Sequence, residues 1–161
     1  MRRNYIIRFD GTYRFLSNFY PYEGNGYTVP FSEPISVAYD EVLYSTSEHA
    51  YQAAKTLDLE ERKVVQAATT AGRAKKEGQR VTLREDWESI KDRAMWEIIC
   101  SKFELNFDMK NKLLATDTAI LVEGNRWHDC YWGVCWCDVC MGKGENRLGQ
   151  LLMRLRKQIK E

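Results

Sequence analysis

Two acidic residues stand in surroundings that favour acid–base or electrostatic chemistry, and Glu48 is the first of them. It lies in the stretch SEHAYQAAK at 47–55. A helix over this stretch places Glu48, Gln52 and Lys55 in one polar stripe, because residues three and four apart are neighbours on a helical surface. That stripe faces either water or a ligand. A lone carboxylate at a helix start is also a common partner of the helix dipole, so Glu48 by itself does not establish a site.

Asp129 is the second acidic residue, and it lies in the aromatic stretch WHDCYWG. Its neighbours are Trp127, His128, Tyr131 and Trp132. A carboxyl group among aromatic rings is partly desolvated, which suits a general acid or base. The same residue type also orders loops by accepting hydrogen bonds from the backbone two residues on, in an Asx turn. Both interpretations of Asp129 stay open at this point.

Four cysteines follow closely in the same loop, with His128 nearby, at Cys130, Cys135, Cys137 and Cys140. Zinc commonly takes four Cys or His ligands, often from C-x2-4-C pairs, and Cys137 with Cys140 forms one such pair. No second clean pair exists, since Cys100 falls within a predicted helix. We therefore expect reduced, packed thiols and no metal. A structural zinc ion held by the four loop cysteines is the alternative.

Composition and charge limit the classes of protein that come into question. The chain has 161 residues, of which 44% are hydrophobic and 29% charged, as in soluble globular proteins. The net charge of +1 argues against binding nucleic acid by bulk charge, although a local basic pocket is compatible with it. No stretch has the length of a membrane helix, and MRRNYIIRFDG does not fit a signal peptide. We expect a cytoplasmic protein without a cofactor or an obligate protein partner.

Residue periodicity predicts the elements that position these side chains. Strands are expected at 5–9, 35–44 and 119–124. Helices are expected at 48–57, 60–69, 70–80, 84–106, 109–116 and 146–160. Residues 124–145 show neither period and form a long loop, and loops of this length are usually functional or disordered. The sequence predicts one compact domain over 1–161, of the α+β class and mostly helical.

Ordered motifs along the chain connect these features to a known family. They include FLSNFYP, SEHAYQAAK, AGRAKKEG, DWESIKDRAM, LVEGN, HDCYWG and GENRLGQLLMRLR. In this order they resemble the NADAR (YbiA-like) N-glycosidase family, over roughly residues 9–157. Such proteins hydrolyse N-glycosidic bonds between a phosphorylated ribose and a base or amine. The resemblance implies either removal of ADP-ribose from guanine in DNA or hydrolysis of phosphoribosylamino intermediates of riboflavin synthesis. A module that binds ADP-ribose without cleaving it is a third hypothesis.

The resemblance also implies which residues line the substrate cleft. They are Ser17, Asn18, Phe19, Glu48, His49, Trp87, Asp129, Trp132 and Gly133. We add as substrate-binding residues Gln52, Lys55, Arg73, Lys91, Asn125 and Asn146. Glu48 and Asp129 are the predicted catalytic pair, one stabilising a sugar cation and the other moving a proton. Lysine and arginine suit phosphate, and Trp87 and Trp132 suit stacking on a base.

The chain departs from the family pattern at two places in the same loop. His128 stands where many members have Asn before the Asp. Between Gly133 and Gly142 the chain carries VCWCDVCM in place of a loop rich in Gly and Asp. Loops commonly set substrate preference, so these departures bear on the choice of substrate.

Overall fold

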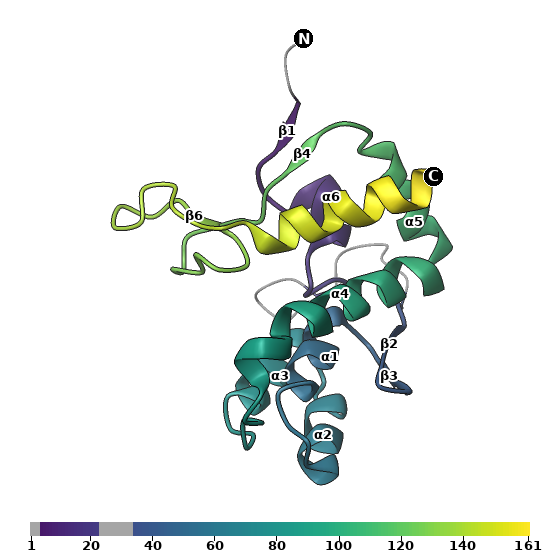
Figure 1. Cartoon of the computed structure of the whole chain (residues 1–161), viewed down its shortest axis with the longest axis vertical. Coiled ribbons are helices and arrows are strands. Elements are labelled where there is room, and N and C mark those ends of the chain that lie inside the picture. Colours follow the sequence, from purple (N-terminus) through teal and green to yellow (C-terminus); the bar gives the residue numbers. More distant parts are fainter. Residues whose placement is uncertain (1–3, 23–33) are drawn as a thin grey trace. The chain divides into compact units, whose positions relative to one another are not determined.

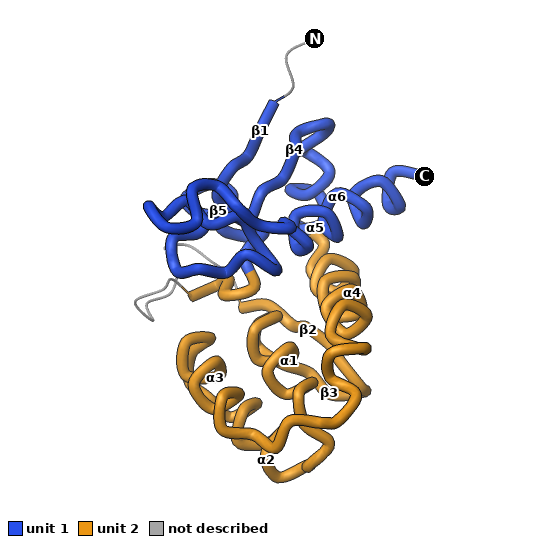
Figure 2. The backbone as a smooth tube through the Cα atoms, turned by 60° about the vertical axis from the view of Figure 1, so that its left-hand side comes forward, with its two compact units in different colours: residues 1–17, 108–161 blue, residues 18–107 orange. Residues whose placement is uncertain are grey.

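The computed structural model describes residues 4–22 and 34–161. The chain divides into two compact units, which are coloured separately in Figure 2. Unit 1 consists of residues 1–17 and 108–161, and unit 2 of residues 18–107. The single domain expected from the sequence stays a prediction.

Helices make up most of unit 2, as the periodicity predicts. They are α1 (Ser47–Ala53), α2 (Leu59–Gln66), α3 (Ala71–Gly78) and α4 (Trp87–Leu105). Helix α1 packs against the other three (Figure 1). Each of the first three helices starts at a capping side chain, Thr46, Asp58 or Thr70, that accepts hydrogen bonds from backbone N–H groups of its first turn. Helix α4 begins after Asp86 as expected, but this carboxylate pairs with Arg84 and makes no cap bond.

Helix α1 is buried along its whole length. Ala50, Ala53 and Ala54 are fully buried, and their small side chains allow the neighbouring helices to approach closely. The polar stripe is buried too, with Glu48 at 7% and Gln52 at 3% exposure. The stripe therefore does not face bulk water, and the helix presents polar groups to the protein interior.

The segment 35–44 is a hairpin, not the one strand that its composition predicts. Strand β2 (Val37–Tyr39) pairs antiparallel with β3 (Val42–Tyr44). The two residues between them, Asp40 and Glu41, have φ angles of 50° and 62°. Two successive residues with positive φ make a tight two-residue hairpin turn. Strand β2 packs on α4, and the Ala38 N–H donates to Ser101 Oγ over 2.6 Å.

Unit 1 is built around short strands and one long helix. Strand β1 (Tyr5–Ile6) pairs parallel with β4 (Ile120–Leu121), and β5 (Gly124–Asn125) pairs parallel with β6 (Val134–Cys135). The 3-10 helix η1 (Gly11–Leu16) follows β1, and α5 (Phe107–Ala115) precedes β4. Helix α6 (Arg147–Lys160) packs on β4 through an apolar face that includes Leu148, Leu152 and Leu155. Short strands and long helices confirm the mostly helical α+β class.

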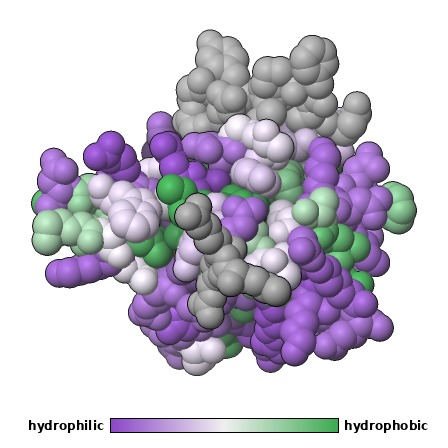
Figure 3. Space-filling model, turned by 90° about the horizontal axis from the view of Figure 1, so that it is seen from above, coloured by the Kyte–Doolittle hydropathy of each residue, from purple (hydrophilic) through white to green (hydrophobic). Residues whose placement is uncertain are grey.

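The outer surface agrees with the composition. Figure 3 shows one face, on which hydrophilic residues predominate and apolar residues form small scattered patches. Within the described residues, no helix combines the length and apolar character needed to cross a membrane.

Candidate functional site

The centre of the candidate site in unit 2 is a buried carboxylate–amide pair. Gln52 Nε2 donates a hydrogen bond of 2.7 Å to Glu48 Oε1, one helical turn apart on α1. The Glu48 backbone N–H donates to the Asn18 carbonyl oxygen over 3.0 Å, which ties α1 to the FLSNFYP segment. The pair fixes the Glu48 carboxylate in one orientation. Three of the predicted site residues, Asn18, Glu48 and Gln52, thus lie together.

Three buried side-chain oxygen atoms, on Gln52 itself and on two residues next to Glu48 in the sequence or bonded to its backbone, have no hydrogen-bond partner in the described part of the chain. They are Asn18 Oδ1, Ser47 Oγ and Gln52 Oε1. Buried polar atoms in native proteins are nearly always bonded, so each such atom points to water or a ligand. Because Gln52 Nε2 is engaged by Glu48, its Oε1 remains as an acceptor for a donor group such as a sugar hydroxyl.

Two lysines supply positive charge close to Glu48. Burial lowers the pKa of Lys55, the nearby Glu48 carboxylate raises it, and Lys75 lowers it. Lys55 Nζ lies 5.8 Å from the centre of the Tyr51 ring, and Lys75 Nζ lies 5.8 Å from that of Phe19. Lysine ammonium groups in a partly buried setting favour an anion such as phosphate. Lys75 was not among the predicted residues; it lies in the quoted motif AGRAKKEG, two residues after Arg73.

The ring of His49, a predicted substrate ligand, makes hydrogen bonds within unit 2. Its ring is fully buried, with Nδ1 2.7 Å from Thr46 Oγ1 and Nε2 2.9 Å from the Ala68 carbonyl oxygen. Because the Ala68 carbonyl oxygen can only accept, Nε2 carries the proton and donates to it. Nδ1 is then an acceptor for the Thr46 hydroxyl, which itself accepts from the His49 backbone N–H. Burial lowers the pKa of His49, against the opposing effect of the Ala68 hydrogen bond. The ring is a neutral brace for the start of α1.

Three other predicted ligands of unit 2 make contacts with neighbouring residues of the same unit. Trp87 is 5% exposed, and its ring packs on Tyr51 at 5.2 Å between centroids, so it belongs to the core of this unit. Lys91 forms an ion pair with Glu88 on the same helix. Arg73 is exposed at the start of α3, where its backbone N–H donates to Thr70 Oγ1. These positions give no support to base stacking by Trp87.

In unit 1, Asp129 forms the Asx turn that was one of its two interpretations. Its Oδ1 accepts hydrogen bonds from the backbone N–H groups of Tyr131, at 3.1 Å, and Trp132, at 2.9 Å. Asn125, which is 3% exposed, supports the same turn from inside: its Nδ2 donates to the Asp129 carbonyl oxygen over 2.7 Å. The Asx turn is confirmed, and the acid–base role of Asp129 stays a prediction.

The remaining predicted residues of unit 1 shape this loop. A Cβ atom on Gly133 would lie 2.2 Å from the Glu123 carbonyl oxygen, so only glycine fits there. Asn146 makes two hydrogen bonds to the backbone that follows β4, accepting from the Glu123 N–H and donating to the Leu121 carbonyl oxygen. Trp132 is half-buried and makes an edge-to-face contact with Tyr131. Asn125 thus bonds the backbone of the loop and Asn146 the backbone just before it, and their role as ligands stays a prediction.

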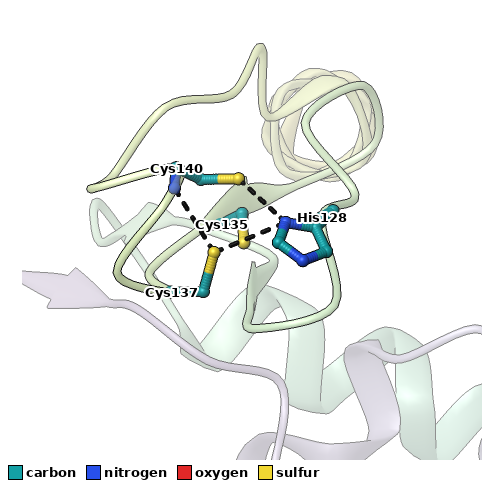
Figure 4. Close-up of side chains that lie close together, drawn as sticks. All are labelled: His128, Cys135, Cys137 and Cys140. Atoms are coloured by element: carbon teal, nitrogen blue, oxygen red, sulfur yellow. Dashed lines mark hydrogen bonds between the residues drawn. The ribbon is translucent and has the colours of Figure 1, made fainter.

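A cluster of soft ligands forms the other feature of this loop (Figure 4). His128 Nδ1 lies 3.2 Å from Cys140 Sγ and 3.4 Å from Cys137 Sγ, and with Cys135 all four ligand atoms lie within 4.8 Å of one another. The zinc alternative of the sequence analysis named Cys130 as the fourth ligand. In the structure His128 takes that place. The Cys140 backbone N–H is the main cause that lowers the pKa of Cys137 to about 7, while neighbouring thiols raise the pKa of Cys140 to about 12.

Each unit therefore gathers its own set of predicted residues. Unit 2 brings together Asn18, Glu48, Gln52 and Lys55, with Phe19 next to Lys75. Unit 1 places Asp129, Trp132 and Gly133 in one loop, and buried Ser17 at the end of η1. The common cleft that the resemblance implies for Glu48 and Asp129 stays a prediction.

Comparison with known proteins shows similar sequences and a similar solved fold. The model of the NADAR domain matches residues 6–160. The N-glycosidase YbiA of Escherichia coli (strain K12) is 41% identical over 128 residues, which are 78% of this chain and 76% of that protein. The riboflavin biosynthesis protein VVA0006 of Vibrio vulnificus (strain YJ016) is 33% identical over 98% of this chain but only 38% of its own length. The NMR structure of E. coli YbiA matches with a TM-score of 0.75 and 33% identity, covering 99% of this chain and 88% of that one.

Proposed function

This chain belongs to the NADAR domain family and is a hydrolase of N-glycosyl compounds, and we propose that it removes ADP-ribose from guanine in nucleic acid. The observation that carries the proposal is the buried pair of Glu48 and Gln52, together with buried oxygen atoms of Asn18, Ser47 and Gln52 that have no partner in the described residues. This arrangement keeps a negative charge and several hydrogen-bond acceptors ready for a sugar that carries hydroxyl groups.

The chemistry requires a group that stabilises positive charge on the sugar. Departure of a base from ribose leaves an oxocarbenium-like centre at C1′, and a fixed carboxylate nearby lowers the energy of that state. Glu48 has this role in our proposal, because its side chain is buried and Gln52 holds its Oε1. Gln52 Oε1 and Asn18 Oδ1 accept hydrogen bonds from ribose hydroxyls.

Proton transfer completes the reaction. Water supplies the hydroxyl group that ends on C1′ and the proton that ends on the leaving nitrogen. In our proposal Asp129 handles this proton. Since Oδ1 already accepts from Tyr131 and Trp132, the role falls to Oδ2, and the Asx turn sets the direction in which that oxygen points.

Lys55 and Lys75 are the proposed binding groups for the diphosphate. Lys75 is one cause that lowers the pKa of Lys55, and an anion bound between the two ammonium groups would oppose that effect. A diphosphate uses both lysines, which favours ADP-ribose over a substrate with one phosphate.

The second candidate is hydrolysis of a phosphoribosylamino intermediate of riboflavin synthesis. It is favoured by the riboflavin biosynthesis protein of Vibrio vulnificus, whose similarity to this chain extends over nearly all of the chain's residues. The Glu48 site would act on such a substrate in the same way. The two candidates differ in the leaving group and in the number of phosphates.

A side-by-side turnover assay separates the candidates. A DNA oligonucleotide carrying ADP-ribose on guanine and a phosphoribosylamino-pyrimidine are incubated with the protein, and released ADP-ribose or ribose phosphate is quantified. We expect a higher kcat/KM on the oligonucleotide. A higher value on the pyrimidine would establish the second candidate. Tight binding of ADP-ribose with no release from either substrate would make the protein a binding module.

A further inference from the structure

We propose that His128, Cys135, Cys137 and Cys140 bind one structural zinc ion. The four ligand atoms belong to one loop of unit 1, and the proposal does not depend on the substrate. The residues come from two segments: His128 from the turn that follows β5, and the cysteines from β6 and the turn after it. In Figure 4 the imidazole Nδ1 points toward the three sulfur atoms.

The spacing of the four ligand atoms fits a tetrahedral zinc site. Zn–S bonds of about 2.3 Å and Zn–N bonds of about 2.0–2.1 Å place S and N ligands about 3.6 Å apart and two S ligands about 3.8 Å apart. The distances of 3.2 and 3.4 Å from His128 Nδ1 to the sulfurs of Cys140 and Cys137 are close to this. All four atoms lie within 4.8 Å of one another, so small rotations of the side chains complete the tetrahedron.

The backbone of the turn holds the cysteines around one point. The Met141 N–H donates to the Cys137 carbonyl oxygen and the Gly142 N–H to that of Cys135, each over 2.8 Å. The Cys140 N–H donates to Cys137 Sγ over 3.3 Å. Such a bond stabilises a thiolate, which is the form that binds metal. Gly142 has a φ of 81°, which allows the chain to reverse direction here.

Apolar packing does not explain the order of this turn. Most large apolar side chains of the loop are mainly in solvent: Trp127 is 62% exposed, Val139 77% and Met141 76%, while Trp136 is half-exposed with its ring against Gly142. Of the three cysteines in the cluster only Cys135 is buried, so the packed thiols expected from the sequence describe one residue of three. A loop that buries so little needs another source of free energy to offset its conformational entropy. A bound metal supplies it.

Ligand count makes the site structural. Four protein ligands fill the tetrahedral coordination of zinc and leave no position for water or substrate. On binding, the three thiols lose their protons to solvent and the neutral imidazole binds through Nδ1, which gives the ion and its ligands a net charge of −1. His128 has a φ of 67°, in the left-handed region that non-glycine residues rarely adopt, and coordination holds it there.

Metal analysis of matched variants tests the proposal. The protein is produced with added zinc, purified under reducing conditions without oxygen, and analysed for metal and for thiols after denaturation. We expect about one zinc ion per chain and five free thiols, and loss of the metal in Cys137→Ser. His128→Asn keeps a side chain that tolerates left-handed backbone and should weaken zinc binding at least ~10-fold in competition with a chelator. Cys130→Ser, in the same loop, and Cys100→Ser, in α4, are the controls that keep the ion.

Other outcomes would overturn the assignment. Wild-type protein without zinc under these conditions would show that the cluster is a group of thiols, and two missing thiols would show a disulfide. Loss of zinc from Cys130→Ser together with its retention in His128→Asn would show that the ligand set is wrong. Cobalt substitution gives an independent readout, since only tetrahedral thiolate coordination yields intense visible bands together with sulfur-to-metal charge transfer.

Discussion

Replacement of Glu48 by Gln should separate catalysis from folding. The change removes one negative charge and keeps the shape of the side chain. If Glu48 stabilises a sugar cation, its charge acts in the transition state more than in the bound substrate. Removing one preorganised electrostatic group of this kind costs about 10²–10³ in kcat, or about 2.7–4 kcal/mol. We expect a loss of that size with little change in KM.

The effect on folding should be much smaller. Gln52 Nε2 donates to Glu48 Oε1 over 2.7 Å, and the amide oxygen of the substituted side chain can accept the same bond. The loss is then the difference between a charge-assisted bond, about 1.5–3 kcal/mol, and a neutral one, about 0.5–1.5 kcal/mol. About 1 kcal/mol corresponds to a fall in Tm of about 2–4 °C for a chain of this size. A Glu48 that served only the helix dipole would cost about 0.3–1 kcal/mol of stability and leave kcat unchanged.

Glu60→Gln is the matched control for this experiment. Glu60 is the second residue of α2, as Glu48 is of α1, but its side chain is 80% exposed. Steady-state kinetics on the ADP-ribosylated oligonucleotide and thermal unfolding are measured for both variants. Normal kcat in Glu48→Gln, or an equal loss in Glu60→Gln, would refute the reasoning.

Three further predictions follow from the described contacts. Asp129→Asn keeps an oxygen that can accept from the N–H groups of Tyr131 and Trp132, so the Asx turn should persist while kcat falls at least ~100-fold. Trp132→Ala should mainly weaken the binding of ADP-ribose, by about 1–3 kcal/mol in calorimetry. Equal loss of affinity in both variants, at unchanged kcat, would make this loop a binding lid. Burial lowers the folded-state pKa of His49 below its unfolded value of about 6.5. Between these two pKa values the unfolded state binds more protons than the folded state. The free energy of unfolding should therefore fall as pH drops below about 6.5. Denaturant titrations from pH 7 to 5 should show a slope of at most about 1.4 kcal/mol per pH unit that His49→Gln removes, and an unchanged slope in that variant would contradict the assignment. Gly78→Ala should destabilise the protein and lower kcat, because its Cβ would lie 2.1 Å from Gln52 Oε1 and 2.6 Å from Gln52 Cβ. Gly72→Ala is the control. Its Cβ would lie 4.0 Å from the nearest atom, and the better helix propensity of Ala should stabilise the protein by up to about 1 kcal/mol.

The helices could be predicted from the sequence because their signals are local. Thr46, Asp58 and Thr70 cap helices that begin one residue later, and the apolar face of α6 repeats at helical spacing. The hairpin at 37–44 was missed because Asp40 and Glu41 lack the Gly or Asn that usually marks a two-residue turn. Tertiary packing of β2 on α4 stabilises this turn, and no local pattern records that packing.

The residue types in the site were easier to predict than their roles. The spacing of Glu48 and Gln52 indicated their shared stripe, but it could not show that both are buried and bonded to each other. His49 and Asn125 were themselves predicted as ligands, and the structure shows both buried and bonded to backbone carbonyl oxygens. A motif records that residues are needed near a site without separating those that contact a ligand from those that hold the loop. Lys75 was missed because its proximity to Lys55 depends on the packing of α3 against α1.

The two departures from the family pattern are one feature in three dimensions. In the sequence, His128 in place of Asn and the insert VCWCDVCM are separate observations several residues apart. In the structure, His128 Nδ1 lies against the sulfurs that the insert contributes, so each change supplies what the other needs to form a four-ligand site. His128 directly precedes Asp129, whose Oδ1 is already fixed by two backbone bonds. A metal at His128 would therefore anchor the backbone on the N-terminal side of the same carboxylate that the Asx turn holds on the other. In place of the Gly- and Asp-rich loop, this chain would then have a rigid support for Asp129, and loss of the metal should act on turnover through the position of that carboxylate.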